Sequence, residues 1–136
     1  MKLLDQIKEI FNKYELKLTE LPTDHKNVYS FLRECPEFKK NFHNDKTDWY
    51  FIEKYRSHIP KGWYGFSLGD PIIPIWCEII DEIVQLCIDN DPNFEIHQIK
   101  IKFGGICFYV ESNIIEDTFE IECLIENTLY DKALIY

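Results

Sequence analysis

The segment QIKIKFGGICFYV, residues 98–110, holds two alternating apolar runs on either side of a glycine pair. Gly104-Gly105 suits a two-residue turn, because both central positions of such a turn need positive φ angles. Counting outward from this turn predicts three apolar cross-strand pairs: Phe103 with Ile106, Ile101 with Phe108, and Ile99 with Val110. The opposite face of the hairpin carries Lys100, Lys102, Cys107 and Tyr109. The sequence therefore predicts a β-hairpin over residues 95–111 with one apolar face.

Helical periodicity is found on both sides of this hairpin. Apolar residues recur at three-to-four spacing over three stretches, about residues 2–16, 74–89 and 114–129. Shorter helices are expected over about residues 24–35 and 47–59, and in the latter Trp49, Phe51, Ile52 and Tyr55 are expected to point inward. A last helix starting at residue 114 takes Ser112 or Asn113 as its cap.

Residues 61–71 differ in character, because they hold three of the five glycines and alternate them with aromatic residues. This pattern predicts a short strand near residues 63–68 between two turns. We expect an α+β fold in which a small antiparallel sheet, made of this strand and the hairpin 95–111, is covered by helices.

The chain of 136 residues has the size of a single domain. Residues 1–45 are expected to form a helical N-terminal segment that is too small to be stable alone, and residues 46–136 the α+β core. Residues 133–136 are apolar, and we expect them to dock on the sheet.

Charge is unevenly distributed along the chain. Residues 1–62 carry twelve Lys or Arg against ten Asp or Glu, whereas residues 63–136 carry three against fourteen, for a total of −9. This balance disfavours direct nucleic-acid binding and an anionic membrane surface, since both need a cationic footprint. An acidic face can instead steer a basic protein partner, and it can equally serve only to keep the protein soluble.

Cysteine use points to a reducing compartment. The five cysteines form no C-x-x-C pair, and none of the four histidines stands at zinc-ligand spacing from a cysteine. No signal-peptide core and no apolar stretch long enough to span a bilayer occurs. We expect a cytoplasmic protein with no cofactor and no structural metal.

One catalytic pattern is present, because residues 65–69 read G-x-S-x-G. In a hydrolase this pattern places a nucleophilic serine, here Ser67, on a strand-to-helix turn. An aspartate (Asp81, Asp89 or Asp91) and then His97 follow it, which gives the chain order Ser, Asp, His of a catalytic triad. The prolines at 71 and 74 stand where the helix should begin, and no βαβ alternation is evident. Catalysis by Ser67 is therefore the weakest of three interpretations. His97 itself lies where the apolar alternation slips between Ile96 and Ile99, which indicates a β-bulge or a strand end. A structural imidazole is favoured over a catalytic one.

A mixed aromatic and cationic surface is the stronger candidate site. If the strand near residues 63–68 pairs beside the hairpin, seven residues can converge on one sheet face: Arg56, Lys61, Trp63, Tyr64, Lys100, Lys102 and Tyr109. Rings and cations together suit a nucleotide-like ligand or a protein hot spot. The alternative is that Trp63 and Tyr64 are core residues and that the lysines only solvate the sheet.

Residues 55–136 resemble a family of uncharacterised small bacterial and phage proteins. The resemblance rests on IPKGWYGF (residues 59–66), QIKIKFGG (residues 98–105) and YDKALIY (residues 130–136). Phage members read KFGGLRFY and carry a C-terminal cysteine pair; here Ile106-Cys107 replaces Leu-Arg and that pair is missing, so the resemblance implies no metal function. It implies no activity, only a bacterial or mobile-element setting, which is often a place where defence, counter-defence and immunity proteins are encoded.

These observations favour a non-enzymatic binding protein, an inhibitor, immunity or defence-related factor that occludes or sequesters a partner. The first alternative is a protein that binds or sequesters a nucleotide-type signal, and the second is a small hydrolase that uses Ser67. The oligomeric state is left open by the sequence.

Overall fold

The computed structural model describes residues 2–19, 46–68, 74–102 and 105–129. Their order along the chain is α1 (Leu3–Thr19), α4 (Asp48–Lys54), the 3₁₀ turn η1 (Arg56–His58), β1 (Gly65–Ser67), α5 (Pro74–Asn90), β2 (Glu95–Lys102), β3 (Gly105–Glu111) and α6 (Thr118–Thr128). The α+β class is confirmed. The helix expected over residues 24–35 and the docking of residues 133–136 lie outside the described residues.

The three strands form a mixed sheet in the order β1-β2-β3. Strands β2 and β3 pair antiparallel, whereas β1 pairs with β2 in parallel, with Phe66 opposite Ile99 and Ser67 opposite Lys100. The expectation of an antiparallel sheet is therefore wrong for β1. Helix α5 connects β1 to β2 and carries the chain back along the sheet, so β2 starts at the same end as β1. This β1-α5-β2 unit also contradicts the sequence prediction that βαβ alternation is missing.

The hairpin register differs from the expected one by two residues. Ile101 lies opposite Ile106, Ile99 opposite Phe108, and Lys102 opposite Gly105, so Gly105 belongs to β3 and residues 103–104 connect the strands. A shift of two residues leaves every side chain on its predicted face, because the side-chain period of a strand is two. Of the two expectations for the slip near His97, a bulge or a strand end, the bulge is confirmed, since the register shifts between Ile96 and Gln98 while Glu95 and Ile96 remain paired with β3.

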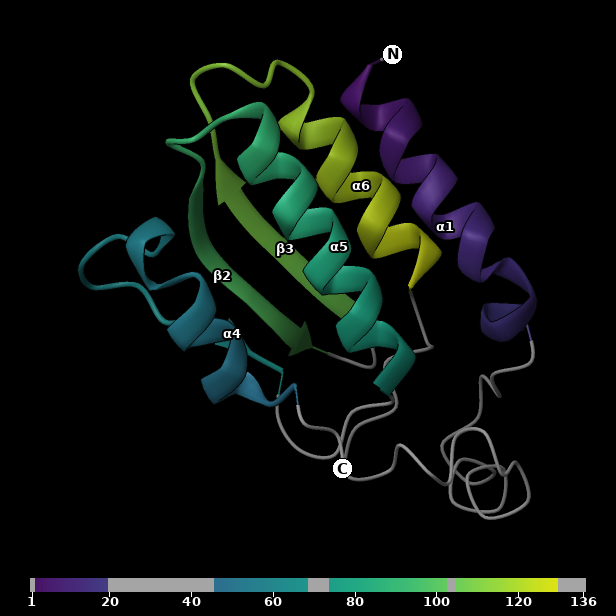
Figure 1. Cartoon of the computed structure of the whole chain (residues 1–136), viewed down its shortest axis with the longest axis horizontal. Helices are drawn as coiled ribbons and strands as arrows, with labels where there is room; N and C mark the ends of the chain where they lie inside the picture. The colour runs from purple at the N-terminus through teal and green to yellow at the C-terminus, as the bar shows by residue number, and fades with distance from the viewer. Residues whose placement is uncertain (1, 20–45, 69–73, 103–104, 130–136) are drawn as a thin grey trace.

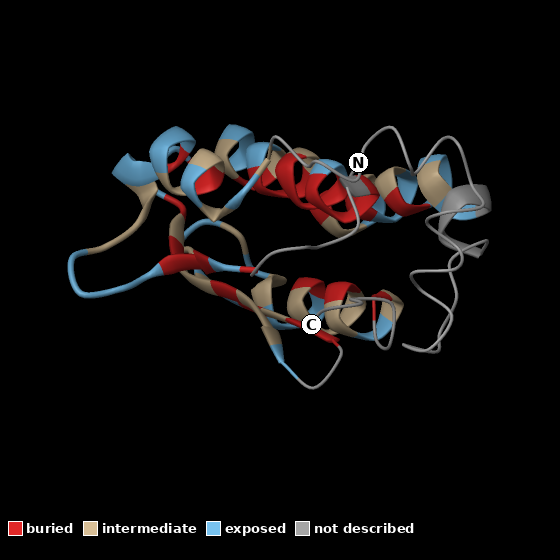
Figure 2. Ribbon diagram, turned by 90° about the horizontal axis from the view of Figure 1, so that it is seen from below, coloured by how far each residue is buried: buried red, intermediate tan, exposed pale blue. Residues whose placement is uncertain are grey.

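The elements form two layers (Figures 1 and 2). Helices α4, α5 and α1 make one layer, and the sheet makes the other, with α6 packed along β3. The core lies between the layers and is built from buried side chains, among them Phe51, Phe66, Trp76, Ile79, Ile83, Ile99 and Phe108. No described helix is long and apolar enough to cross a membrane.

Helix α4 is held against α5 by the buried carboxylate of Asp81. Tyr50 Oη donates to Asp81 at 2.9 Å, Lys54 Nζ donates at 2.9 Å, and the Tyr55 hydroxyl donates to the same carboxylate. Burial alone raises the pKa of Asp81, but the hydrogen bonds from Tyr55 and Lys54 outweigh burial, so the pKa lies below its ordinary value. Asp81 is therefore charged and fully partnered at neutral pH.

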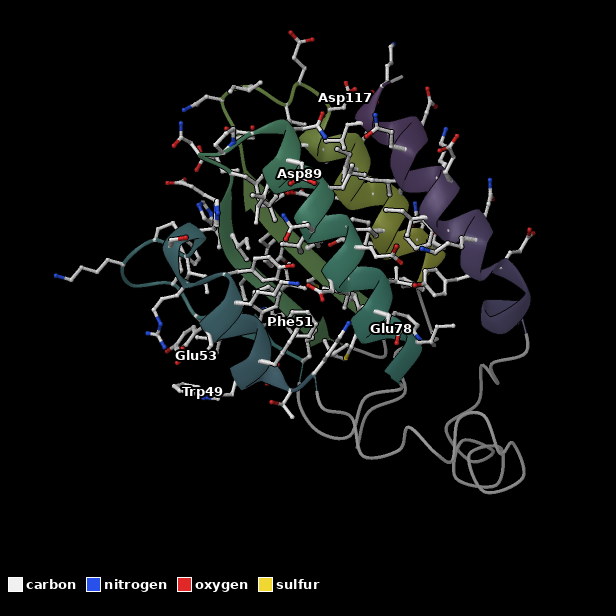
Figure 3. The ribbon with its side chains drawn as sticks, viewed as in Figure 1. Trp49, Phe51, Glu53, Glu78, Asp89 and Asp117 are labelled. Atoms are coloured by element: carbon white, nitrogen blue, oxygen red, sulfur yellow. The ribbon has the colours of Figure 1, made fainter. Side chains whose placement is uncertain are left out.

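Two apolar side chains of the predicted helices, Trp49 and Ile114, are exposed. Trp49 is 64% exposed and, like Glu53, points away from the protein in Figure 3, while Phe51 on the same helix is buried. Ile114, expected in the last helix, is 60% exposed because α6 begins only at Thr118. The Ser112 hydroxyl accepts hydrogen bonds from the backbone N–H groups of Ile114 and Ile115, which forms a turn rather than a helix cap.

Helix α6 protects the outer edge of β3. The backbone N–H of Phe108 donates to Glu126 at 3.3 Å, and the backbone N–H of Val110 donates to Glu122 at 3.4 Å. Both N–H groups belong to a strand at the edge of the sheet, where an unpaired strand is open to other chains. The acidic side chains of α6 therefore act as a substitute for a fourth strand.

Candidate functional site

The sheet has one face toward the helical layer and one face away from it (Figure 2). We call the second face the open face, because α1, α4 and α5 cover only the other one among the described residues. Strand alternation places on it Ser67, Gln98, Lys100, Lys102, Cys107 and Tyr109, which are all exposed or partly buried. Polar side chains on this face avoid the cost of burying unpaired polar groups, which is why the alternation is stable in this orientation.

An exposed aromatic ring and a lysine lie together on the open face. Lys100 Nζ is 5.7 Å from the ring centroid of Tyr109, which is 41% exposed. A hydrogen bond with Cys107 raises the pKa of Tyr109, so its hydroxyl is neutral at physiological pH. The pair presents a positive charge and a π face to solvent.

Trp63 comes from the loop before β1. Its indole stacks on the imidazole of His97, with ring centroids 4.6 Å apart and an interplanar angle of 7°. Trp63 remains 48% exposed, so only one side of its ring is used in this contact. The prediction that Trp63 is available on the surface is therefore consistent with its exposure, and the alternative that it is a core residue is wrong.

The remaining predicted residues do not all converge. Lys61 and Tyr64 lie in the exposed loop before β1, and Tyr64 is 75% exposed. Arg56 belongs with α4 instead: it donates to Glu53 at 2.7 Å and lies 5.8 Å from the ring centroid of Trp49. The structure thus brings Trp63, Lys100, Lys102 and Tyr109 to the sheet and leaves Arg56 on the helical side.

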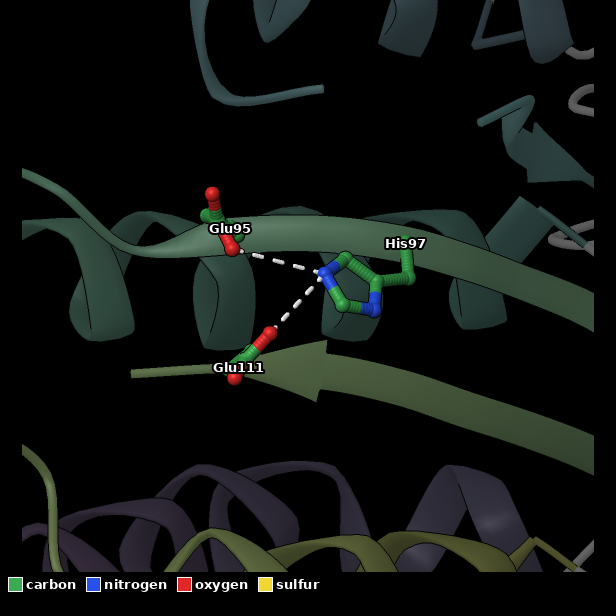
Figure 4. Close-up of side chains that lie close together, drawn as sticks. All are labelled: Glu95, His97 and Glu111. Carbon is green, nitrogen blue, oxygen red and sulfur yellow. Dashed lines mark hydrogen bonds and ion pairs between the residues drawn. The ribbon is translucent and has the colours of Figure 1, made fainter. Parts of the chain in front are cut away.

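One group at the end of the open face was not predicted from the sequence. His97 Nε2 lies 3.4 Å from a carboxylate oxygen of Glu95 and 3.4 Å from one of Glu111 (Figure 4). The donor atoms of these three residues all lie within 4.8 Å of one another. The expected register places Glu111 away from Glu95, whereas the bulge brings the two opposite each other. The available signal was the Glu-x-His spacing of residues 95–97, which puts both side chains on one face of a strand.

Ser67 and His97 lie apart along the sheet. Ser67 is exposed at the end of β1 and lies opposite Lys100 of β2. Lys100 is three residues beyond His97, so Ser67 and His97 are separated by about 10 Å along the strand direction. The next helix of the described residues, α5, begins at Pro74, and residues 69–73, where a strand-to-helix turn after Ser67 would have to lie, are outside the described residues.

A cavity of about 260 Å³ borders the open face at Glu95. It is lined by Ser57, His58, Pro60, Pro92, Asn93, Phe94 and Glu95. His58 Nδ1 lies 2.9 Å from the carbonyl oxygen of Phe94, so this histidine holds the loop before β2. Lys100 and Tyr109 do not line this cavity and project from the surface of the sheet.

Searches against protein-family models, curated proteins and solved structures found no match to this chain.

Proposed function

We propose that the protein is a non-enzymatic binding protein that occludes or sequesters a protein partner with its open face, as an inhibitor, immunity or defence-related factor does. The observation that carries this proposal is the exposure of Trp63, which stacks on His97, and of Tyr109, which lies beside Lys100, at a sheet face that α1, α4 and α5 leave open among the described residues. Exposed aromatic rings in a polar surround are typical of protein-binding hot spots.

The shape of the surface favours a protein over a small molecule. Small-ligand sites are concave and enclose most of the ligand, whereas Lys100 and Tyr109 stand on the outer surface of a sheet. A sheet face of this kind matches the flat surface of another protein.

Charge favours a partner with a basic surface. The chain carries −9, and Glu95 and Glu111 lie at one end of the open face while the acidic helix α6 lies along β3. Such a field accelerates encounter with a positively charged partner and weakens with salt. In this arrangement the aromatic rings provide most of the binding affinity, and the surrounding carboxylates raise the rate of association.

The proposal is tested by affinity capture from an extract of the source organism, with three immobilised proteins in parallel. These are the wild type, the double variant Trp63→Ala/Tyr109→Ala, and the control Trp49→Ala, which removes a more exposed ring from α4. A specific partner is expected on the wild type and on Trp49→Ala, with at least about a tenfold loss on the double variant. A partner that the double variant retains in full contradicts the proposal.

The nucleotide-binding alternative is supported by the Lys100–Tyr109 pair, since a cation beside a ring suits a base and a phosphate. A panel of nucleotides in a thermal-shift assay separates the two. A rise in melting temperature that is lost in Lys100→Ala favours the small ligand, because a ligand stabilises the folded state by mass action.

A further inference from the structure

We propose that Glu95, His97 and Glu111 form a binding site for a divalent first-row transition-metal ion at the end of the open face. Three observations carry this inference: the opposition of two carboxylates, the orientation of the imidazole, and the spacing of the donor atoms. It does not depend on the proposed protein partner.

The two glutamates are directly opposite each other on neighbouring antiparallel strands, in the pair Glu95↔Glu111. Like charges in this relationship are destabilising. A dication between the two carboxylates removes the repulsion and leaves the site with no net charge when His97 is the neutral ligand.

His97 is held in a position to complete the site. It is the residue at which the register shifts, and it lies two positions from Glu95, so alternation puts both side chains on one face. The stack on Trp63 fixes the plane of the imidazole and leaves Nε2 directed at the two carboxylates. Orientation of a ligating histidine by its surroundings is a common feature of metal sites.

The spacing of the donor atoms fits a small ion. Ligands at about 2.1 Å from a tetrahedral metal are separated by about 3.4 Å. His97 Nε2 is 3.4 Å from both carboxylate oxygens, and all donor atoms lie within 4.8 Å. The side chains of Glu95 and Glu111 are 47% and 62% exposed, so rotation in solvent can close the remaining distance.

The chemistry of the donors selects the kind of ion. One imidazole and two carboxylates suit Zn²⁺, Mn²⁺ or a related ion, whereas Ca²⁺ takes six to eight oxygen ligands. Three protein ligands leave at least one coordination position for water.

The test uses Zn²⁺ in isothermal titration calorimetry on the full chain with its thiols kept reduced. The expected result is one ion per chain, and at least about a tenfold loss of affinity in Glu111→Gln and in His97→Gln. Glu111→Gln alters a side chain that is 62% exposed, so its folding is expected to be intact, and circular dichroism checks this. The control Glu120→Gln changes an exposed glutamate of α6 and is expected to bind as the wild type does.

A second readout locates the ion. Paramagnetic Mn²⁺ is expected to broaden the indole N–H resonance of Trp63, which stacks on His97, before that of the buried Trp76. The proposal is overturned if the wild type binds no Zn²⁺, if Glu111→Gln binds it as tightly, or if Mn²⁺ leaves the Trp63 resonance unchanged.

Discussion

The indole of Trp63 and the imidazole of His97 lie almost parallel, with centroids 4.6 Å apart. Trp63 belongs to the loop that precedes β1, and His97 lies at the bulge of β2. The stack joins two segments that are distant in sequence, so the position of the loop and the orientation of His97 depend on each other. Any partner that contacts the exposed side of the indole also contacts a ring that is already fixed.

Replacement of Trp63 by alanine is expected to lower the free energy of unfolding by about 1 kcal/mol, because aromatic pairs contribute about 0.5–1.5 kcal/mol beyond area burial. The neighbouring Tyr64→Ala removes a ring that is 75% exposed and is expected to change stability by less than about 0.5 kcal/mol. Urea unfolding of both variants measures the difference. Equal losses in the two variants would show that the stack adds no stability.

The two glycines that flank Trp63 and Tyr64 give a second prediction. Gly62 and Gly65 both have positive φ angles, of 93° and 74°. A Cβ at Gly65 would lie 2.8 Å from Ile59 Cγ1, whereas a Cβ at Gly62 meets nothing within 4 Å. Gly62→Ala is therefore expected to cost about 1–2 kcal/mol from backbone strain alone. Gly65→Ala adds a steric cost of about 1–3 kcal/mol.

Chemical denaturation of the two glycine variants tests this order. The contrast between them isolates the steric part, since the unfolded chain gains the same methyl group in both. A Gly65→Ala protein as stable as Gly62→Ala would mean that Ile59 moves aside at no cost.

The faces of the hairpin could be predicted from the sequence, but its register could not. Alternation assigns Ile99 and Phe108 to the core and Lys100 and Tyr109 to the opposite face in any register shifted by two residues. The glycine pair favoured a turn at residues 104–105, yet Gly105 pairs with Lys102 in the sheet. The pairing of the two strands therefore outweighed the local preference of the glycine pair for a turn.

Parts of the site escaped prediction for the same reason. The opposition of Glu95 and Glu111 follows from the true register together with the bulge. The slip in apolar alternation indicated the bulge, but the register between two strands is not fixed by the spacing of residues within one of them. The strand direction of β1 was also hidden, because it depends on how α5 crosses the sheet. Arg56 and Trp49 were misplaced because a short helix such as α4 has too few turns for its apolar face to be assigned.

The edge of β3 gives a third prediction. Glu122→Leu/Glu126→Leu removes the acceptors for the N–H groups of Val110 and Phe108 and replaces them with apolar groups that exclude water. The free energy of unfolding is expected to fall by about 1–2 kcal/mol, and the freed strand edge to promote self-association. Denaturation and sedimentation at several protein concentrations measure the two effects.

The matched control for the edge is Glu122→Gln/Glu126→Gln. Amide oxygens accept the same hydrogen bonds, and the change removes a charge at Glu122, whose pKa is raised by burial and by the charge of Glu126. This variant is expected to self-associate no more than the wild type does and to be at least as stable. Self-association of the glutamine variant to the extent of the leucine variant would exclude the backbone acceptors as the cause.

The buried carboxylate of Asp81 gives the last prediction. Asp81→Asn removes the charge that Lys54 and Tyr55 partner, and it is expected to lower the free energy of unfolding by about 2 kcal/mol. The cost is below that of breaking a fully buried ion pair, because the Lys54 side chain is 37% exposed and stays hydrated. Asp89→Asn, on the exposed face of the same helix, is the control and is expected to change stability by less than about 0.5 kcal/mol.

The pH dependence of this difference identifies its electrostatic part. The pKa of Asp81 is lower in the folded state than its ordinary value of 3.8, so the folded state binds fewer protons at this group than the unfolded state does. Its contribution is therefore fully present above about pH 5 and is lost as the pH falls below about 4, through the folded pKa. The difference in unfolding free energy between the wild type and Asp81→Asn is expected to be constant from pH 7 to 5 and to shrink below pH 4. A difference that does not change down to pH 2.5 would mean that the asparagine loses packing or hydrogen bonds and that the charge of Asp81 contributes nothing to holding α4 against α5.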